Sequence, residues 1–436
     1  MPPGASEKSP RTKQFGARIS ENSVYSIVGL RRLVVLLALL GACVLLPGCG
    51  GGEPKRSKTL LIAVNAPFSR APYIGLAIAG GAELAASGPG ATVTTEEGKF
   101  TFRIKRYDSG LSARTAVANV RRAVADGAVA ILDEGTGVNA SWRIAGDTPL
   151  CIAFQGGEGL VDPDERPNVF RIAPTDHGVA FRLAEYLIPK KKRIALIADD
   201  SDYGQHGLKA LDEAFSANEE SVALRLTIPS RAPDLSPQIL RARRAGASAL
   251  LVWAQPAGIA GALAAARGSG WDVPVYTPAT GEDPLVREQL ANHPEWVDGL
   301  TFATGRPTAE VGSGPFLSFQ RQYEERFGVQ FVAVRTRKGA QVIQPPDYAM
   351  YSFDFVNVLA AAMQRADTVR DKEKILTALE EVSVGGANGD SRGFNERNHD
   401  GVVDDDVYFA RFENMTYRPV QDDPLSATLP VIEQTR

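Results

Sequence analysis

Short apolar segments alternate with amphipathic segments along most of the chain from Lys58 onward. The apolar segments carry few polar positions, which is typical of strands whose two faces are both covered by helices. The strands expected in the first part are Leu60–Asn65, Phe102–Tyr107, Ala128–Asp133 and Pro149–Phe154, and the helices between them are Tyr73–Ala86 and Ser112–Asp126. Strands and helices in alternation predict a parallel sheet.

The same pattern then begins a second time. The expected strands are Arg193–Asp199, Val222–Ile228, Ala249–Ala254, Pro274–Thr277 and Leu300–Thr304, and the expected helices are Tyr203–Ala217, Leu235–Ala245, Pro256–Arg267 and Pro284–Ala291. We therefore expect an α/β protein with two mostly parallel sheets, each with helices on both faces.

The last part of the chain does not begin a third unit of this kind. It predicts three helices, Phe316–Phe327, Tyr348–Arg365 and one around Asp371–Glu381, a strand at Val407–Phe412, and an exposed loop over 330–346. We expect these helices and this strand to be additions to the two sheets predicted above.

The segment before Lys58 has the features of an export signal. Two arginines precede an uncharged apolar run from Leu33 to Leu46, which is short for a membrane span but has the length of a signal-peptide core. The following string Leu46-Pro47-Gly48-Cys49 resembles the bacterial lipobox, although Pro47 stands where a small residue is usual. We therefore expect lipidation of Cys49; the alternative is a buried apolar helix with an incidental cysteine.

Composition narrows the possible functions. The chain of 436 residues has 48 basic and 51 acidic side chains, and this balance argues against a nucleic-acid-binding protein. Its length allows two domains with separate cores. Cys43 lies in the expected signal peptide and Cys49 is the expected anchor, so Cys151 has no partner and the fold is expected to stand without a disulfide.

Several short strings, spaced in order between Lys58 and Val420, match one family. They are Gly80–Ala85, Tyr107-Asp108, Asn168–Asp176, Asp199–Gly204, Tyr351–Asp354 and Phe394–Glu396. Together they resemble the branched-chain amino acid type of periplasmic solute-binding protein, the two-lobed type I receptor of ABC importers. The resemblance implies two lobes joined by a three-segment hinge, a small-molecule ligand in the cleft between them, and an ABC permease in the inner membrane as partner.

The resemblance also implies domain boundaries. The hinge crossings are expected at Ile172–Asp176, Thr301–Gly305 and Arg392–Asn395. The expected parts are an extension with signal peptide over 1–48, a linker over 49–58, lobe one over 59–174 plus 304–391, lobe two over 175–303 plus 392–420, and a tail over 421–436.

Two residues are the first candidates for ligand contact. Tyr203 lies just past the strand that ends at Asp199, opens the next helix, and matches a ligand-contacting tyrosine of the family. Asp176 follows the first hinge crossing and matches an acidic group that faces the ligand's ammonium. The alternatives are a tyrosine that packs under its own loop and an aspartate that caps a helix beginning near Gly178.

The remaining candidates lie at other strand ends. They are Thr136, Asn139, Gln155, Gly156 and Gly157 in lobe one, and Trp253, Gln255 and Thr280 in lobe two. Gly156 and Gly157 stand where the family usually has small hydroxyl residues, so the pocket is expected to be atypical. Asp133 and Glu134 would repel an anionic ligand, and we interpret them as solvated turn residues.

No catalytic pattern is recognisable. The four histidines lack metal-ligand spacing, and the chain has neither a Gly-x-Ser-x-Gly nucleophile motif nor a phosphate-binding loop. We therefore expect a lipid-anchored receptor of the cell envelope, without cofactor or metal, for a small polar ligand such as an amino acid or a relative of one. A ligand sensor on the same fold without transport is the alternative, and an enzyme is the less favoured third.

Overall fold

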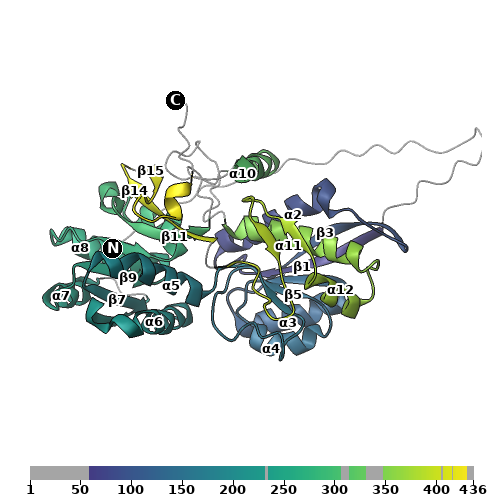
Figure 1. Ribbon diagram of the computed structural model, residues 1–436, viewed down its shortest axis with the longest axis horizontal. Coiled ribbons are helices and arrows are strands. Elements are labelled where there is room, and N and C mark those ends of the chain that lie inside the picture. Colours follow the sequence, from purple (N-terminus) through teal and green to yellow (C-terminus); the bar gives the residue numbers. More distant parts are fainter. Residues whose placement is uncertain are drawn as a thin grey trace, which may run out of the picture. The chain divides into compact units, whose positions relative to one another are not determined.

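The computed structural model describes residues 58–230, 234–305, 314–329, 347–403, 406–414 and 416–429. The expected signal peptide, Cys49 and the loop over 330–346 lie outside these residues. Ser57–Arg436 forms one compact unit. Its described part holds two large, mostly parallel sheets surrounded by helices, which confirms the predicted fold class (Figure 1). No helix in this part of the chain has the length and apolar character needed to cross a membrane.

The first sheet has the strand order β2-β3-β1-β4-β5-β6, and only β2 runs antiparallel to its neighbour. Its strands are β1 (Lys58–Ala66), β2 (Val93–Thr95), β3 (Gly98–Asp108), β4 (Ala128–Asp133), β5 (Leu150–Ile152) and β6 (Val169–Arg171). Its helices are α2 (Pro72–Ser87), α3 (Ala113–Ala125), α4 (Val138–Ala145), α10 (Gly314–Phe327), α11 (Asp347–Arg365) and α12 (Lys372–Leu379). We call this sheet with its helices the first lobe.

The packing of β1 explains why the strands of the first lobe are apolar at almost every position. Leu61 and Ala63 of β1 pack on the face covered by α3 and α4. Ile62 and Val64, one residue further along, pack on the opposite face with α2 and α11. Because successive side chains of a strand point to opposite faces, a sheet covered on both sides needs apolar residues at every position.

The second sheet has the order β15-β14-β11-β10-β9-β7-β8. Its strands are β7 (Ile194–Asp199), β8 (Val222–Ile228), β9 (Ala249–Trp253), β10 (Val275–Thr277), β11 (Thr301–Gly305), β14 (Val407–Glu413) and β15 (Thr416–Pro419). β14 runs antiparallel to β11 and β15, and the other pairs are parallel. We call this sheet with its helices the second lobe.

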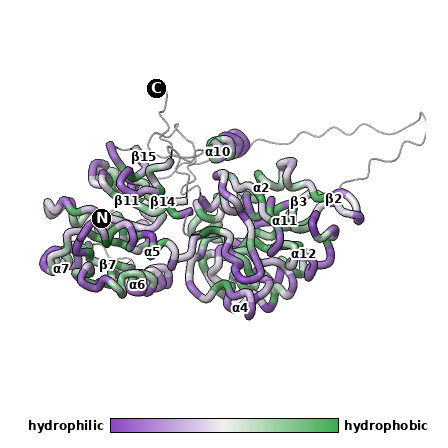
Figure 2. The backbone as a smooth tube through the Cα atoms, in the orientation of Figure 1, coloured by the Kyte–Doolittle hydropathy of each residue, from purple (hydrophilic) through white to green (hydrophobic). Residues whose placement is uncertain are grey.

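The second lobe is also covered on both faces. α5 (Asp176–Leu187) and α6 (Asp202–Phe215) pack on one face. α7 (Ser236–Arg244), α8 (Pro256–Gly268) and α9 (Pro284–Gln289) pack on the other. Figure 2 shows the consequence, with apolar residues gathered around the strands and polar residues on outer helices such as α7.

One expected boundary is wrong in detail. Phe394 and Val402 belong to the buried cluster of the first lobe, and the ring of His399 stacks on Phe170 of β6 at 4.1 Å between centroids. The segment from Phe394 to Val402 therefore packs with the first lobe. The crossing expected at Arg392–Asn395 is too early, because these apolar side chains are buried against the first sheet before the chain reaches β14.

Candidate functional site

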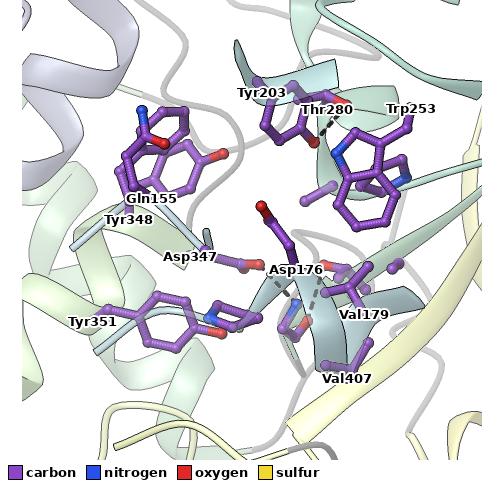
Figure 3. A pocket seen from close by; sticks show the side chains of 18 residues that line it. Gln155, Asp176, Val179, Tyr203, Trp253, Thr280, Asp347, Tyr348, Tyr351 and Val407 are labelled. Atoms are coloured by element: carbon purple, nitrogen blue, oxygen red, sulfur yellow. Dashed lines mark hydrogen bonds between the residues drawn. The ribbon is translucent and has the colours of Figure 1, made fainter. Parts of the chain in front are cut away.

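A cavity of about 70 Å³ lies between the two lobes, at the carboxyl ends of their parallel strands (Figure 3). Ligands of open α/β sheets bind at this edge. One water needs on the order of 10–15 Å³ on the same measure, so the cavity has room for a small organic group. Its lining residues are Phe154, Gln155, Gly156, Pro174, Asp176, Val179, Tyr203, Trp253, Pro278, Ala279, Thr280, Ala303, Thr304, Gly305, Asp347, Tyr348, Tyr351 and Val407.

The first lobe lines the cavity with two segments. One is the loop after β5, which provides Gln155 and Gly156. The other is the start of α11, which provides Asp347, Tyr348 and Tyr351. Positions four apart lie on the same face of a helix, so Asp347 and Tyr351 line the cavity from successive turns.

Asp176 enters the cavity from the first turn of α5 in the second lobe. The residue that caps this helix is Thr175, whose hydroxyl accepts a hydrogen bond from the Gly178 N–H at 2.8 Å. The alternative interpretation of Asp176 as the cap is therefore wrong. Its carboxylate is left to point into the middle of the cavity, as Figure 3 shows, and only 7% of the residue is exposed.

Tyr203 and Trp253 form an aromatic wall in the second lobe. Tyr203 lies in the first turn of α6, and its hydroxyl is 3.4 Å from the Thr280 hydroxyl. Trp253 ends β9, and its ring centroid lies 5.9 Å from that of Tyr203. Gly207 of α6 permits this packing, because a Cβ there would stand 2.2 Å from a Trp253 ring atom.

Three polar atoms at the cavity have no hydrogen-bond partner among the described residues. They are Asp347 Oδ1, the Tyr351 hydroxyl and Trp253 Nε1. The other oxygen of Asp347 accepts a hydrogen bond from the Gly305 N–H at 2.7 Å. A buried polar atom without a partner costs roughly 1–3 kcal/mol, so a bound molecule that satisfies these atoms recovers this free energy.

The cavity has an acidic character. Burial raises the pKa of Asp176 to about 7, and Glu158 adds to this shift while Arg171 opposes it. Burial also raises the pKa of Asp347 to about 7, against the opposing effects of the Gly305 N–H and Arg392. No lysine, arginine or histidine is among the described lining residues.

Six of the predicted site residues line this cavity: Asp176, Tyr203, Gln155, Gly156, Trp253 and Thr280. Thr136 and Asn139 do not. The Thr136 hydroxyl is bonded to Glu134 at 2.5 Å and lies 3.4 Å from the Gln155 amide, so Thr136 stands behind Gln155. Asn139 accepts a hydrogen bond from Arg166 instead, at 2.7 Å.

Gly157 and Gln255 also lie outside the lining. The carbonyl of Gly157 accepts a hydrogen bond from Arg171 at 2.8 Å. Gln255 precedes α8, and its N–H donates to the Asp199 carboxylate at 2.6 Å. Both residues have structural contacts at the strand ends where we expected ligand contacts.

The interpretation of Asp133 and Glu134 as solvated turn residues is wrong, because both are fully buried. Asp133 accepts hydrogen bonds from the Asn65 amide and the Gly135 N–H, each at 2.7 Å. Burial, with the charge of Glu134 next to it, raises the pKa of Asp133 to about 7. Neither carboxylate lines the cavity.

Sequence reasoning missed the contribution of α11. Tyr348–Arg365 was expected only as an amphipathic helix, and Asp347 was not considered. The available signal was a cluster of one acidic and two aromatic side chains, Asp347, Tyr348 and Tyr351, at the start of a helix that follows Pro345-Pro346. Tyr348 and Tyr351 also belong to the buried cluster of the first lobe, so only the acidic side chain of Asp347 distinguishes this helix start from a core position.

Neither metal nor disulfide chemistry is indicated in the part of the chain that the structure describes. No group of three or more His, Cys, Asp or Glu side chains there could hold a metal ion. Cys151 is buried with a free thiol.

The sequence matches the family model of the periplasmic binding proteins over residues 69–416. The chain belongs to the periplasmic binding protein family. The match confirms the expected membership of the periplasmic binding proteins, and the solved structures confirm the expected two-lobed type I fold. Membership of this family of solute-binding receptors implies an extracytoplasmic location.

Solved periplasmic binding proteins share the fold at low sequence identity. A leucine-binding protein of Thermotoga maritima is 20% identical, with a TM-score of 0.67 over 83% of this chain and 97% of its own. A branched-chain amino acid-binding protein of Streptococcus pneumoniae, in complex with isoleucine, is 18% identical, with a TM-score of 0.66 over 83% and 98%. A solute-binding protein of Rhodopseudomonas palustris, in complex with benzoate, is 14% identical, with a TM-score of 0.67 over 83% and 95%. A search of curated protein sequences finds no significant match.

Proposed function

We propose that this chain is the solute-binding receptor of an ABC importer. The receptor captures a small polar ligand, such as an amino acid or a relative of one, in the cavity between its lobes. It then delivers this ligand to the permease. The observation that carries this proposal is the cavity itself, which is lined from both lobes by residues that include three with a buried polar atom without a partner among the described residues. A ligand that contacts both lobes stabilises the closed arrangement, and that is the physical basis of capture by hinge closure.

The proposed contacts divide between the lobes. Asp176, with its buried carboxylate, and Tyr203, with its ring, act on the ligand from the second lobe, next to Trp253 and Thr280. Gln155 and Gly156 of the first lobe support it from the other side, and Asp347, Tyr348 and Tyr351 complete the enclosure.

A thermal-shift screen of the Ser57–Arg436 unit against a library of small solutes tests the proposal. A ligand at a hundred times its dissociation constant stabilises a protein by about 2.7 kcal/mol. We expect at least one solute to raise the melting temperature and to be recovered chemically unaltered by mass spectrometry. A library in which nothing stabilises the protein would contradict the proposal, and turnover of the bound solute would favour an enzyme.

The transport role needs a separate experiment, because binding alone does not separate an importer receptor from a sensor. Uptake of the labelled ligand is measured in cells with and without the gene. Loss of uptake in the deletion strain is the expected result. Unchanged uptake with intact binding would favour the sensor.

We also propose that Cys49 carries a lipid anchor, which rests on the apolar run and the lipobox-like string before it. In cells fed radioactive palmitate, Cys49→Ala is expected to abolish labelling, because the acceptor thiol is gone. Cys151→Ala is the matched control and should leave labelling unchanged. Labelling of the Cys49→Ala protein at the wild-type level would contradict the proposal.

A further inference from the structure

We propose that the ligand of this cavity is an organic cation without a carboxylate group, an amine held between Asp176 and Asp347 and enclosed by aromatic rings. This inference rests on the proposed function, since it assumes that the cavity binds a solute. It narrows the ligand class from amino acids and their relatives to amines.

The two carboxylates approach the cavity from opposite lobes. Asp176 comes from α5 and Asp347 from α11, and Figure 3 shows both side chains directed into the same space. They are 7% and 2% exposed. Asp347 Oδ1 has no partner, and the Asp176 carboxylate accepts no hydrogen bond from the described residues. Two buried acceptors of this kind suit a donor group with positive charge.

The guanidinium groups of Arg171 and Arg392, whose charges act on these carboxylates, lie outside the lining and pair with other acids, and only Arg392 Nη2 has no hydrogen-bond partner among the described residues. Arg171 donates to both oxygens of Asp400, at 2.5 and 3.1 Å. Arg392 donates to Asp406 at 2.8 Å and to Asp354 at 3.3 Å. A carboxylate on a ligand would therefore meet no unpaired cation in the cavity, and it would stand close to two like charges in a region of low dielectric constant.

The position of Gly156 strengthens the same conclusion. A Cβ at this residue would lie 2.5 Å from Asp176 Oδ1, so the Asp176 carboxylate fills the space beside the glycine. An anionic group bound along the Gly156 backbone would contact that carboxylate directly. A cationic group in the same place would pair with it.

Aromatic rings form much of the remaining wall. Tyr203 and Trp253 line the cavity from the second lobe, and Phe154, Tyr348 and Tyr351 line it from the first. Phe154 and Tyr348 pack edge to face at 5.0 Å between centroids. The faces of such rings attract cations, and the attraction is larger in a desolvated site.

The experiment compares matched pairs that differ only by a carboxylate. The probes are benzylamine with phenylglycine, 3-methylbutylamine with leucine, and agmatine with arginine. Affinities for the Ser57–Arg436 unit are measured by calorimetry at pH 8, where both aspartates can ionise around a cation. At least one amine is expected to bind at least tenfold more tightly than its carboxylate-bearing partner.

Two variants then test the assigned residues. Asp176→Asn and Asp347→Asn keep the side-chain shape and remove the charge, and each is expected to weaken amine binding at least tenfold. Asp200→Asn is the control, because it removes the same charge from an exposed residue outside the cavity; it should stay within twofold of wild type. The comparison of probe pairs uses the wild-type protein, so it decides the question even where a variant fails to fold.

Other outcomes separate this inference from the proposed function. If a carboxylate-bearing probe binds more tightly than its amine, or binds better to Asp176→Asn than to wild type, the inference is overturned and the receptor role stands. If no probe pair and no member of a wide solute library binds, the proposed function fails, and the inference fails with it.

Discussion

The backbone position of Asp176, one residue after the cap of α5, decides that its carboxylate faces the cavity and does not cap the helix. Thr175 caps α5, so the next residue is helical and its carboxylate is directed into the cavity. The same arrangement buries a group that prefers water when charged. Asp347 is in a comparable position on α11. Both residues therefore weaken the unliganded fold in their ionised form.

This burial predicts a pH dependence of stability. The pKa of Asp176 and of Asp347 is about 7 in the folded protein, against about 3.9 in an unfolded chain. The folded state keeps these protons up to a higher pH than the unfolded state does. The free energy of unfolding therefore falls as pH rises from about 4 to about 7. We expect a higher melting temperature at pH 5 than at pH 8 without ligand, with each carboxyl contributing on the order of 1–3 kcal/mol.

The double variant Asp176→Asn, Asp347→Asn isolates this effect. It keeps the neighbouring charges of Arg171, Glu158 and Arg392 and removes the two titrating groups. Its melting temperature should fall less between pH 5 and pH 8 than that of wild type. An equal fall would mean that other buried carboxyls, such as Asp133 and Asp354, account for the pH dependence.

Tyr203 gives a second prediction at the residue scale. Tyr203→Ala removes the ring that lies against Trp253 at the cavity, and it is expected to weaken ligand binding more than tenfold through lost contact area. Tyr203→Phe keeps the ring and loses only the long contact with Thr280, so its affinity should stay within about threefold. Calorimetry with a ligand from the screen measures both. Equal affinities in the two variants would mean that the ring does not contact the ligand.

At the scale of elements, α11 connects the core of the first lobe to the cavity. It packs closely on α2 at Gly81, where a Cβ would stand 1.9 Å from the Ala349 carbonyl oxygen. Gly81→Ala is expected to destabilise the protein by about 2–4 kcal/mol, because the two helices must separate. It should also weaken ligand binding, since α11 carries Asp347 and two of the tyrosines.

Gly268 provides the control for this substitution. It lies at the end of α8, and a Cβ there would meet only Trp296 at 3.7 Å, an ordinary contact. Gly268→Ala should therefore be neutral or slightly stabilising. Urea denaturation of the two variants gives the comparison. A loss of less than 1 kcal/mol in Gly81→Ala would show that the helices adjust without cost.

The elements also show what the sequence could predict. The bounds of β4 and β8 agree with the expected Ala128–Asp133 and Val222–Ile228, because long apolar runs between polar turns carry a strong signal. Five strands of three or four residues in the described part of the chain were missed: β2, β6, β12 (Ser383–Gly385), β13 (Ser391–Gly393) and β15. β5 and β10 are as short, and they were predicted from the runs at Pro149–Phe154 and Pro274–Thr277. The apolar pattern therefore locates a strand where a run of apolar residues surrounds it, and it does not locate short strands in polar surroundings such as β12 and β13.

Most of the candidate site residues were also predicted from the local sequence pattern, which places them at strand ends. Tyr203, Trp253 and Thr280 were predicted because they follow strands, and strand ends meet at one edge of a sheet. Asp347 and Tyr351 were missed because they follow no strand, and only tertiary packing brings the start of α11 to the loop after β5. Thr136 and Gln255 were predicted by the same strand-end argument, which does not reveal that their polar groups have structural partners.

At the scale of the whole unit, a few contacts outside the cavity connect the lobes. Lys209 of α6 pairs with Glu158, in the loop after β5, at 2.6 Å. The Tyr73 hydroxyl of α2 interacts with the carboxyl of Asp283, which caps α9, and each group shifts the pKa of the other. The Lys209 side chain is 72% exposed, and exposed ion pairs contribute at most about 1 kcal/mol. We therefore expect the Tyr73 contact, which is better shielded from water, to matter more for closure.

Tyr73→Phe tests this contact. Loss of the hydroxyl removes a polar neighbour of the buried Asp283 carboxyl, which keeps the Leu285 N–H as a donor, so ligand affinity should fall by about three- to tenfold. Tyr186→Phe is the matched control, because the Tyr186 hydroxyl bonds to Asp422 at 2.9 Å within the second lobe. The control should change stability and leave affinity within twofold. Similar affinities in the two variants would argue against a role for Tyr73 in closure.

The contact between Gly156 and Asp176 has a consequence for divergence among related receptors. With aspartate at residue 176, any side chain at residue 156 would meet a carboxylate oxygen at 2.5 Å. The same Cβ would also lie 2.8 Å from the Asp176 backbone nitrogen and 2.8 Å from the Pro174 carbonyl oxygen, so sterics oppose an exchange at residue 156 whatever side chain stands at residue 176. A related receptor with a larger residue at position 156 is therefore expected to hold the loop after β5 further from the start of α5 than this chain does.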